Sequence, residues 1–334
     1  MFIDPHVHCR DGKQAYKETI KHALAVAEKA GMTAIFDMPN IDPPVITKEH
    51  ALERIQLAKD SPVFYGAYLA LTGDPEEVRA GVAAVREVRE IIGFKLYAGH
   101  SVGRIGVIDE EKQQLIYNTL AEEEYDGVVV VHCEKESLLT DWDPKNPISH
   151  CRARPPAAEV ASVQDQINFA KAAGFKGTLH IAHVSVPEAV DLVNKENFVT
   201  CGVCPHHLLF DETAMEKENG ILLKMNPPLR PPGMKEELLQ QLRDGKITWI
   251  ETDHAPHTLK EKANEPYMSG IPGLQIYPKF IQWLREQGIP EKQIEEITFN
   301  KIADTYKLDI LPRDCEPILE LGDEYEFDVY KGVI

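Results

Sequence analysis

The chain has 334 residues, of which 43% are hydrophobic and 27% are charged, so it can bury a core as one large domain or as two ordinary ones. Its formal net charge of −18 argues against nucleic-acid binding, because proteins that bind the phosphate backbone usually carry a basic face. Residues 1–20 lack the pattern of a signal peptide, and apolar runs such as 127–132 are too short to cross a bilayer. The six cysteines are too sparse for a disulfide scaffold. We therefore expect a cytoplasmic globular protein that binds neither nucleic acid nor membrane.

Apolar segments typical of strands alternate along the chain with longer amphipathic segments typical of helices. The strand-like segments are residues 2–8, 33–40, 63–71, 93–97, 127–133, 177–185, 198–204 and 247–257. The clearest helix-like segments are residues 16–31, 47–60, 75–91, 109–124 and 158–174. Eight strands that each lead to a helix predict a (β/α)8 TIM-type barrel over residues 1–310. A doubly wound open sheet is the alternative, but it would need a phosphate-binding glycine turn after the first strand, and the sequence has none there.

Residues 311–334 follow the predicted barrel as a tail that could supply one or two short strands at most. A β-sandwich extension beside the barrel is therefore expected to be vestigial or absent. Unpaired strands at such a tail could be covered by another subunit. The sequence leaves open a homo-oligomer or an association with another enzyme.

Metal-competent and polar side chains fall near the ends of the predicted strands. His6 and His8 stand at alternate positions, so on a strand both point to the same face. The other such residues are Asn40, Lys95, His132, His183 and Asp253. Because the carboxyl ends of barrel strands converge at one mouth, a barrel would gather these residues into one cluster.

Each of these residues also has a purely structural interpretation. Lys95 could be a surface lysine, although a lysine on a buried strand is rare unless it is paired or modified. His132 or His183 alone would often be an ordinary core histidine, and His180 competes with His183 for a ligand role. Asp253 could cap a turn. Taken together, such coincidences at one rim become improbable, and the pattern favours a metal site.

The motifs that contain these residues resemble those of one enzyme family. They are HVHCR, MPN, GFKLY, VHCE, HIAHVS, PHHLLF, NPPLR and TDHAPH. In this combination they resemble the dihydroorotases of the amidohydrolase superfamily, whereas H-x-H alone is common to the whole superfamily. The resemblance runs from about residue 2 to Gly273.

The resemblance implies two zinc ions per chain, bridged by carboxylated Lys95 and a hydroxide. His6 and His8 would hold one zinc, and His132 with His183 the other. Asp253 would contact the first zinc and serve as the catalytic proton shuttle. The residues implied to bind the substrate carboxylate or ring are Arg10, Asn40, His257 and Asn226. The implied reaction is the reversible cyclisation of N-carbamoyl-L-aspartate to L-dihydroorotate in de novo pyrimidine biosynthesis, so the expected partner is a small molecule.

Two other functions stay open at this point. One is a different cyclic amidohydrolase of the hydantoinase or allantoinase type, for which Arg10, Asn40 and His257 are the discriminating residues. The other is a catalytically silent homologue that acts as a scaffold, for instance for another pyrimidine-pathway enzyme. Such proteins usually lose metal ligands, and this chain keeps the full set.

Two segments carry weaker signals. Residues 97–107, with His100, Ser101 and Arg104, form either a lid over the site or an exposed connector. Cys201 and Cys204 form a C-x-x-C followed by two histidines, for which a structural zinc or a redox pair is conceivable. Because a second C-x-x-C is missing, we interpret this segment as the seventh strand, with a structural role.

Overall fold

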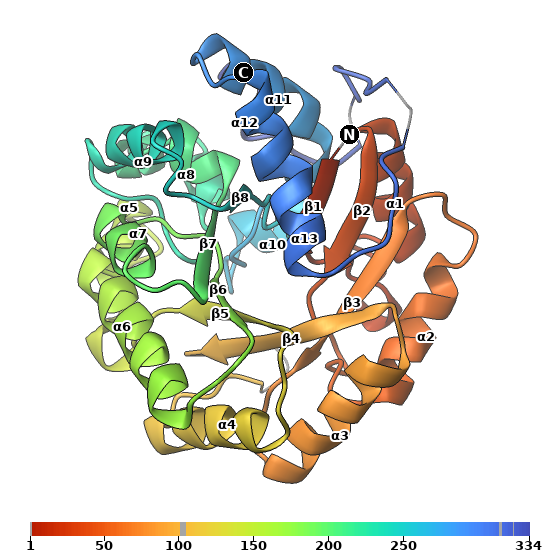
Figure 1. Cartoon of the computed structure of the whole chain (residues 1–334). Helices are drawn as coiled ribbons and strands as arrows, with labels where there is room; N and C mark the ends of the chain where they lie inside the picture. Colours follow the sequence, from red (N-terminus) through yellow and green to blue (C-terminus); the bar gives the residue numbers. More distant parts are fainter. Residues whose placement is uncertain (1, 101–104, 314–315, 323) are drawn as a thin grey trace.

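The computed structural model of the chain describes residues 2–100, 105–313, 316–322 and 324–334. Eight strands form one parallel sheet in the order β1 to β8, and helices surround it (Figure 1). The strands are β1 (Phe2–Val7), β2 (Met32–Asp37), β3 (Phe64–Ala70), β4 (Ile91–Ala98), β5 (Val128–Cys133), β6 (Thr178–Ile181), β7 (Val199–Val203) and β8 (Trp249–Ile250). The predicted (β/α)8 barrel is confirmed, and each of the eight strands begins within two residues of its expected starting point.

Helices follow the strands along the chain and form the outer layer. They are α1 (Ile20–Lys29), α2 (Lys48–Ala58), α3 (Pro75–Glu87), α4 (Glu110–Glu122), α5 (Ile148–Ala153), α6 (Pro156–Ala173), α7 (Pro187–Val193), α8 (Pro205–Leu209), α9 (Met234–Arg243), α10 (Leu259–Ala263), α11 (Tyr277–Glu286), α12 (Glu291–Glu295) and α13 (Lys301–Thr305). None of the helices in the described ranges is long and apolar enough to cross a membrane.

The barrel closes between its first and last strands beyond the regular ladder. The backbone N–H of His8 donates to the carbonyl of His254 at 2.7 Å, and Val7 forms a parallel bridge with His254. This contact brings the end of β1 against the segment that follows β8. Residues from the two ends of the barrel sequence therefore meet at one rim.

Alternation along the strands decides which side chains enter the barrel. On β5, Val129 and Val131 pack in the core between strands and helices, whereas Val128 and Val130 pack in a second core inside the barrel. His132 continues the inward series by one more step of two residues. Phe299 and Ile302 belong to the same inner core. The residues of β5 run from this core at Val128 and Val130 to His132 at the carboxyl end of the strand.

Helix α1 begins later than the sequence pattern predicted. The helical pattern starts at residue 16, but Thr19 caps the helix by accepting from the N–H of His22, and the carboxylate of Asp11 accepts from the N–H of Ile20. Residues 16–19 therefore precede the helix. This leaves the side chain of Lys17 free to turn toward the barrel mouth.

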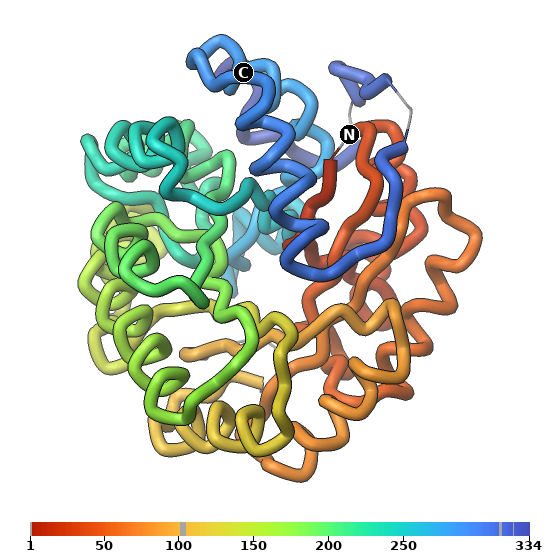
Figure 2. Tube along the Cα trace, viewed as in Figure 1, coloured from red at the N-terminus to blue at the C-terminus, as the bar shows by residue number. Residues whose placement is uncertain are grey.

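The tail packs against the start of the barrel rather than extending a sheet. Within its described residues, 311–313, 316–322 and 324–334, no strand forms. The N–H of Ile318 donates to the carbonyl of Lys29 at 2.9 Å, so the part of the tail around Ile318 lies beside the end of α1, whereas the C-terminus lies near α11 (Figure 2). Phe327 and Tyr330 are buried in the outer core.

Candidate active site

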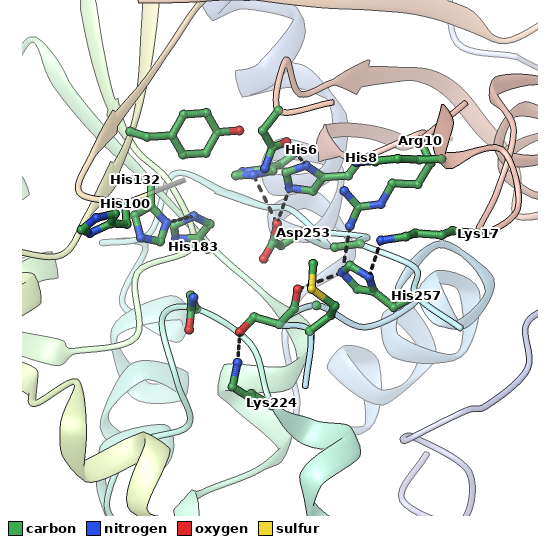
Figure 3. Close-up of a pocket in the computed structure, with 18 of the residues that line it drawn as sticks. His6, His8, Arg10, Lys17, His100, His132, His183, Lys224, Asp253 and His257 are labelled. Atoms are coloured by element: carbon green, nitrogen blue, oxygen red, sulfur yellow. Dashed lines mark hydrogen bonds and ion pairs between the residues drawn. The ribbon is translucent and has the colours of Figure 1, made fainter. Parts of the chain in front are cut away.

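A cavity of about 360 Å³ opens at the carboxyl ends of the strands (Figure 3). Nine of the ten residues predicted for the site line it, namely His6, His8, Arg10, Asn40, His132, His183, Asn226, Asp253 and His257. The tenth, Lys95, is fully buried. The structure thus brings together side chains that are far apart in the sequence.

Three of the predicted metal ligands meet around one carboxylate oxygen. The Nε2 atoms of His8 and His6 lie 3.0 and 3.3 Å from Oδ1 of Asp253. Nδ1 of His8 lies 2.6 Å from Oδ1 of Asn40, which accepts its proton and directs Nε2 toward Asp253. Burial acts to raise the pKa of Asp253, but the facing His8 and His6 outweigh it and hold that pKa well below its usual range. Asp253 is therefore an ionised acceptor at neutral pH.

The other two histidines form a second group. Nδ1 of His132 and Nε2 of His183 are 3.2 Å apart. Nε2 of His132 donates to Oε2 of Glu134 at 2.9 Å, and Arg154 holds the same carboxylate through two hydrogen bonds of 3.0 and 2.6 Å. Glu134 thereby fixes the ring of His132 so that Nδ1 faces His183.

Lys95 lies on β4, and its Nζ lies 5.1 Å from the ring centroid of Tyr97. Its Nζ is buried and makes no hydrogen bond with any of the described residues. Burial lowers the pKa of Lys95 from 10.5 to about 8. A neutral amine is the form that adds carbon dioxide to give an anionic carbamate and a proton, so this environment suits the predicted modification.

The donor set fits the predicted pair of divalent cations. The rings of His6 and His183 lie 5.0 Å apart between centroids, so the two groups are neighbours. His8 and His132 each give one nitrogen to a protein acceptor and direct the other toward a second ligand, which is the pattern of metal-bound histidines. Imidazole and carboxylate donors are ligands that zinc accepts.

The opposite side of the cavity gathers hydrogen-bond donors. Lys17 donates to Nδ1 of His257 at 3.1 Å, which places the ring proton on Nε2. That Nε2 lies 3.0 Å from the carbonyl oxygen of Ser269 and 3.2 Å from an Nη2 of Arg10. Burial, together with Arg10 and Lys17, holds the pKa of His257 well below its usual range, so the ring is neutral. Arg10 therefore places a cation in this part of the cavity, as an anionic substrate would require, while the ring N–H of His257 is directed to the carbonyl of Ser269.

Asn40 and Asn226, which are both predicted to bind the substrate, differ in the contacts of their amide groups. Asn40 uses its amide oxygen on His8, so its N–H groups are the part that could face a substrate. Oδ1 of Asn226 is buried and has no hydrogen bond to the described part of the chain.

The predicted lid segment, residues 97–107, is described only in part. Ser101 and Arg104 lie outside the described residues, while His100 lines the cavity and pairs with Glu136 at 2.6 Å.

The structure separates His180 from His183. His180 stacks on Trp249 at 4.0 Å between centroids, and its two nitrogens face Thr200 and Glu251. Both of its nitrogens are thus satisfied within the barrel, whereas His183 faces the cavity. Glu251 occupies the space beside Gly202, where a Cβ would lie 2.5 Å from its carboxyl carbon.

Several residues at the site were missed by sequence reasoning. Glu134 stands two residues after His132, and the same alternate-position argument used for His6 and His8 would have found it. Lys224 also lines the cavity and donates to Oγ of Ser269 at 2.7 Å. Lys17 was hidden inside a helical pattern, and nothing local distinguishes it from a surface lysine.

Comparison with known proteins identifies the family. No family model matches the chain. A dihydroorotase from Halobacterium salinarum is 30% identical over 313 residues, which cover 92% of this chain and 71% of that protein. The chain belongs to the dihydroorotase family.

Solved structures of two enzymes share this barrel fold. The dihydroorotase from Saccharomyces cerevisiae in complex with 5-fluoroorotic acid has a TM-score of 0.74 at 19% identity, covering 92% of this chain and 84% of that one. An L-hydantoinase from Arthrobacter aurescens has a TM-score of 0.78 at 22% identity, covering 92% and 70%. At these identities the likeness shows a shared barrel and does not separate dihydroorotases from hydantoinases.

Glu134→Gln is expected to weaken the retention of divalent metal by roughly 10- to 100-fold, because partners that orient a metal-binding histidine typically contribute that much. The measurement is metal content per chain after dialysis against a graded series of chelator concentrations. Glu136→Gln, on the same segment but paired with His100, is the matched control and should behave as the unmodified chain. If all three proteins retained the same amount of metal, Glu134 would not be the residue that orients His132 for metal binding.

Proposed function

We propose that this chain is a metal-dependent dihydroorotase that interconverts N-carbamoyl-L-aspartate and L-dihydroorotate. The observation that carries the proposal is the pairing, in one cavity, of a metal-competent His/Asp cluster with a separate donor group made by Arg10 and His257. A cyclic amide that carries a carboxylate matches both halves. The membership of the dihydroorotase family supports the same substrate.

The donor set supports two zinc ions as the resident metals. His6, His8 and Asp253 would hold one, His132 and His183 the other, and carboxylated Lys95 would bridge them. When bound, the two ions polarise the amide carbonyl and lower the pKa of water toward neutrality. The outward N–H groups of His8 and His132 go to Asn40 and Glu134, which keep both rings in the orientation that binding needs.

Asp253 is the group that moves the proton. In the hydrolytic direction it accepts a proton from the attacking water and delivers it to the ring nitrogen as the carbon–nitrogen bond breaks. In the synthetic direction, Asp253 takes the proton from the attacking nitrogen and passes it to the departing hydroxide, which leaves as water. The low pKa of its carboxyl means that it begins hydrolysis as a base.

Arg10 and His257 hold the substrate carboxylate, and this choice sets specificity. Hydantoin and allantoin lack a carboxylate at that place, so they would leave the buried guanidinium of Arg10 without an anionic partner. A site built for a polar group rejects analogues that lack it, because its own groups are then left unpaired. The backbone contact of Arg10 Nε with the carbonyl of Pro256 at 3.2 Å fixes the guanidinium for this task.

The function is tested by offering the purified chain dihydroorotate, hydantoin and allantoin at equal concentrations and following ring opening. We expect clear preference for dihydroorotate. Comparable or faster opening of hydantoin or allantoin would replace the proposal with that of another cyclic amidohydrolase. Zinc at two per chain with no turnover of any of the three would indicate a silent scaffold.

Asp253→Asn should lower kcat by about 10²- to 10⁴-fold, the usual contribution of a positioned acid–base group, while much of the metal stays bound. Steady-state kinetics and metal analysis on the same preparation measure the two effects. The exposed Asp244→Asn at the end of α9 should change neither. A variant of Asp253 with substantial residual rate would exclude it from proton transfer.

Arg10→Lys should raise KM for dihydroorotate by roughly 10- to 100-fold with a smaller effect on kcat, since a lysine loses the planar fork that pairs with a carboxylate. The variant is compared with Lys13→Ala, which removes an exposed cation that pairs with Asp42. If KM were unchanged in Arg10→Lys, the carboxylate would have to bind elsewhere.

Lys95 should carry one carbon dioxide, and mass spectrometry under gentle conditions should find the carbamate together with two zinc ions. Lys95→Ala should lose the added mass and much of the metal. Lys262→Met is the matched control, because Lys262 is equally buried but donates to the carbonyl of Lys224 at 2.7 Å. An unmodified Lys95 in a chain that retains both metals would contradict the bridging role.

A further inference from the structure

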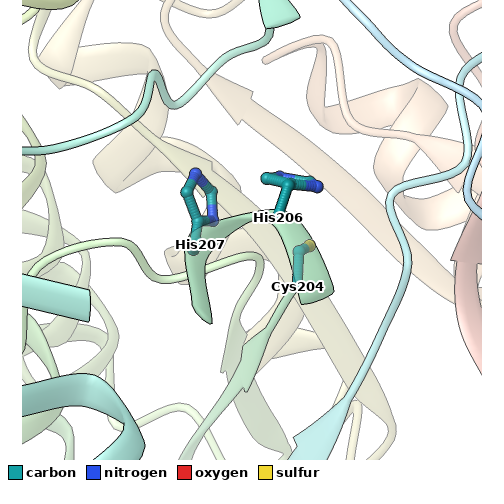
Figure 4. A group of neighbouring side chains, drawn as sticks. All are labelled: Cys204, His206 and His207. Atoms are coloured by element: carbon teal, nitrogen blue, oxygen red, sulfur yellow. The ribbon is translucent and has the colours of Figure 1, made fainter. Parts of the chain in front are cut away.

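A second group of metal-competent side chains lies outside the catalytic cluster. Cys204, His206 and His207 follow strand β7 and gather at the turn into α8 (Figure 4). All three side chains are buried, and one donor atom from each lies within 4.8 Å of the other two. None of them belongs to the set proposed to hold the catalytic metals.

Three of the four ring nitrogens of this group lack a hydrogen-bond partner among the described residues. Both ring nitrogens of His206 and Nδ1 of His207 are buried and make no hydrogen bond within the described ranges. A buried polar atom without a partner is destabilising, and here three such atoms lie at one turn. The cluster therefore points to a partner that binds nitrogen lone pairs.

The one satisfied nitrogen tells how His207 is oriented. Its Nε2 lies 3.1 Å from the carbonyl oxygen of Pro227 and donates its proton there. Nδ1 is then the nitrogen with the free lone pair. A histidine that gives one N–H to a backbone carbonyl and keeps the other nitrogen free has the arrangement found in metal-bound imidazoles.

We propose that Cys204, His206 and His207 bind a third divalent cation, with zinc as the expected metal. One sulfur and two imidazole nitrogens form a donor set that zinc favours, and hard oxygen-preferring cations such as Mg²⁺ do not. Three protein donors leave a fourth tetrahedral position for a water molecule. On binding, the thiol loses its proton to solvent and the thiolate takes its place as the ligand.

The position of this site gives it a structural role next to the catalytic cavity. His207 contacts Pro227, and the neighbouring Asn226 lines the cavity. A cation held at the turn after β7 would fix His207 and, through Pro227, the segment that carries Asn226. The site would therefore stiffen one wall of the cavity without contacting the substrate.

The test uses the sulfur ligand as a reporter that the catalytic centre cannot mimic, because the proposed catalytic ligands contain only nitrogen and oxygen. The full-length chain is depleted of metal and loaded with Co²⁺. We expect three cobalt ions per chain and a thiolate-to-cobalt charge-transfer band in the near ultraviolet. Cys204→Ser should lose the band and one cobalt per chain, whereas Cys201→Ser, a buried cysteine three residues earlier on β7, should keep both.

Two outcomes of the cobalt experiment would overturn the proposal. The unmodified chain would show no charge-transfer band, or the band would survive in Cys204→Ser. X-ray absorption on the zinc-loaded unmodified chain avoids any folding defect of the variants. It should show a zinc–sulfur shell at about 2.3 Å, and its absence would also refute the site. One cobalt per chain with the band would support this site while contradicting the two-metal catalytic centre, so the two proposals fail separately.

Discussion

Burial of basic nitrogens at the carboxyl ends of the strands is the constraint on which the rest of this site depends. His8 and His132 each satisfy one nitrogen with a protein acceptor, and the other faces a carboxylate or another imidazole. Lys95 is fully buried and its Nζ has no partner within the described residues. Leaving such groups unpaired is costly, and the proposed cations and the proposed carboxylation of Lys95 would remove that cost. The stability of this mouth and its chemistry therefore have the same physical origin.

The barrel creates this arrangement by simple alternation. Inward positions deep in the strands carry apolar side chains such as Val128 and Val130, and the same face ends in His132. In register across β4 and β5, Lys95 lies opposite Val130 and Tyr97 opposite His132. An apolar inner core thus supports the polar groups that lie one layer above it. The support is rigid because packed interiors do not yield easily to small displacements.

The sequence predicted the strands and the metal-competent residues because both follow local rules of period and strand-end position. It did not predict the groups that orient them, because those partners come from distant segments. Lys17 and His257 are 240 residues apart, and the early cap at Thr19, which frees Lys17 from the helix, is a local feature with a tertiary consequence. Glu134 was also missed, but it is not a distant partner: its spacing of two residues from His132 would have placed it on the same face of the strand.

The net negative charge of the chain is compatible with the proposed anionic substrate, because the two charges that matter to that substrate act over different distances. The net charge of −18 is spread over a surface on which exposed charges are screened beyond about 10 Å at 0.1 M salt. The Arg10 donor group is buried, so it is screened much less and acts at hydrogen-bond distance. Global repulsion therefore lowers the rate at which an anion arrives, whereas the local donors determine whether it stays. Added salt should thus matter more for association than for the affinity of the bound carboxylate.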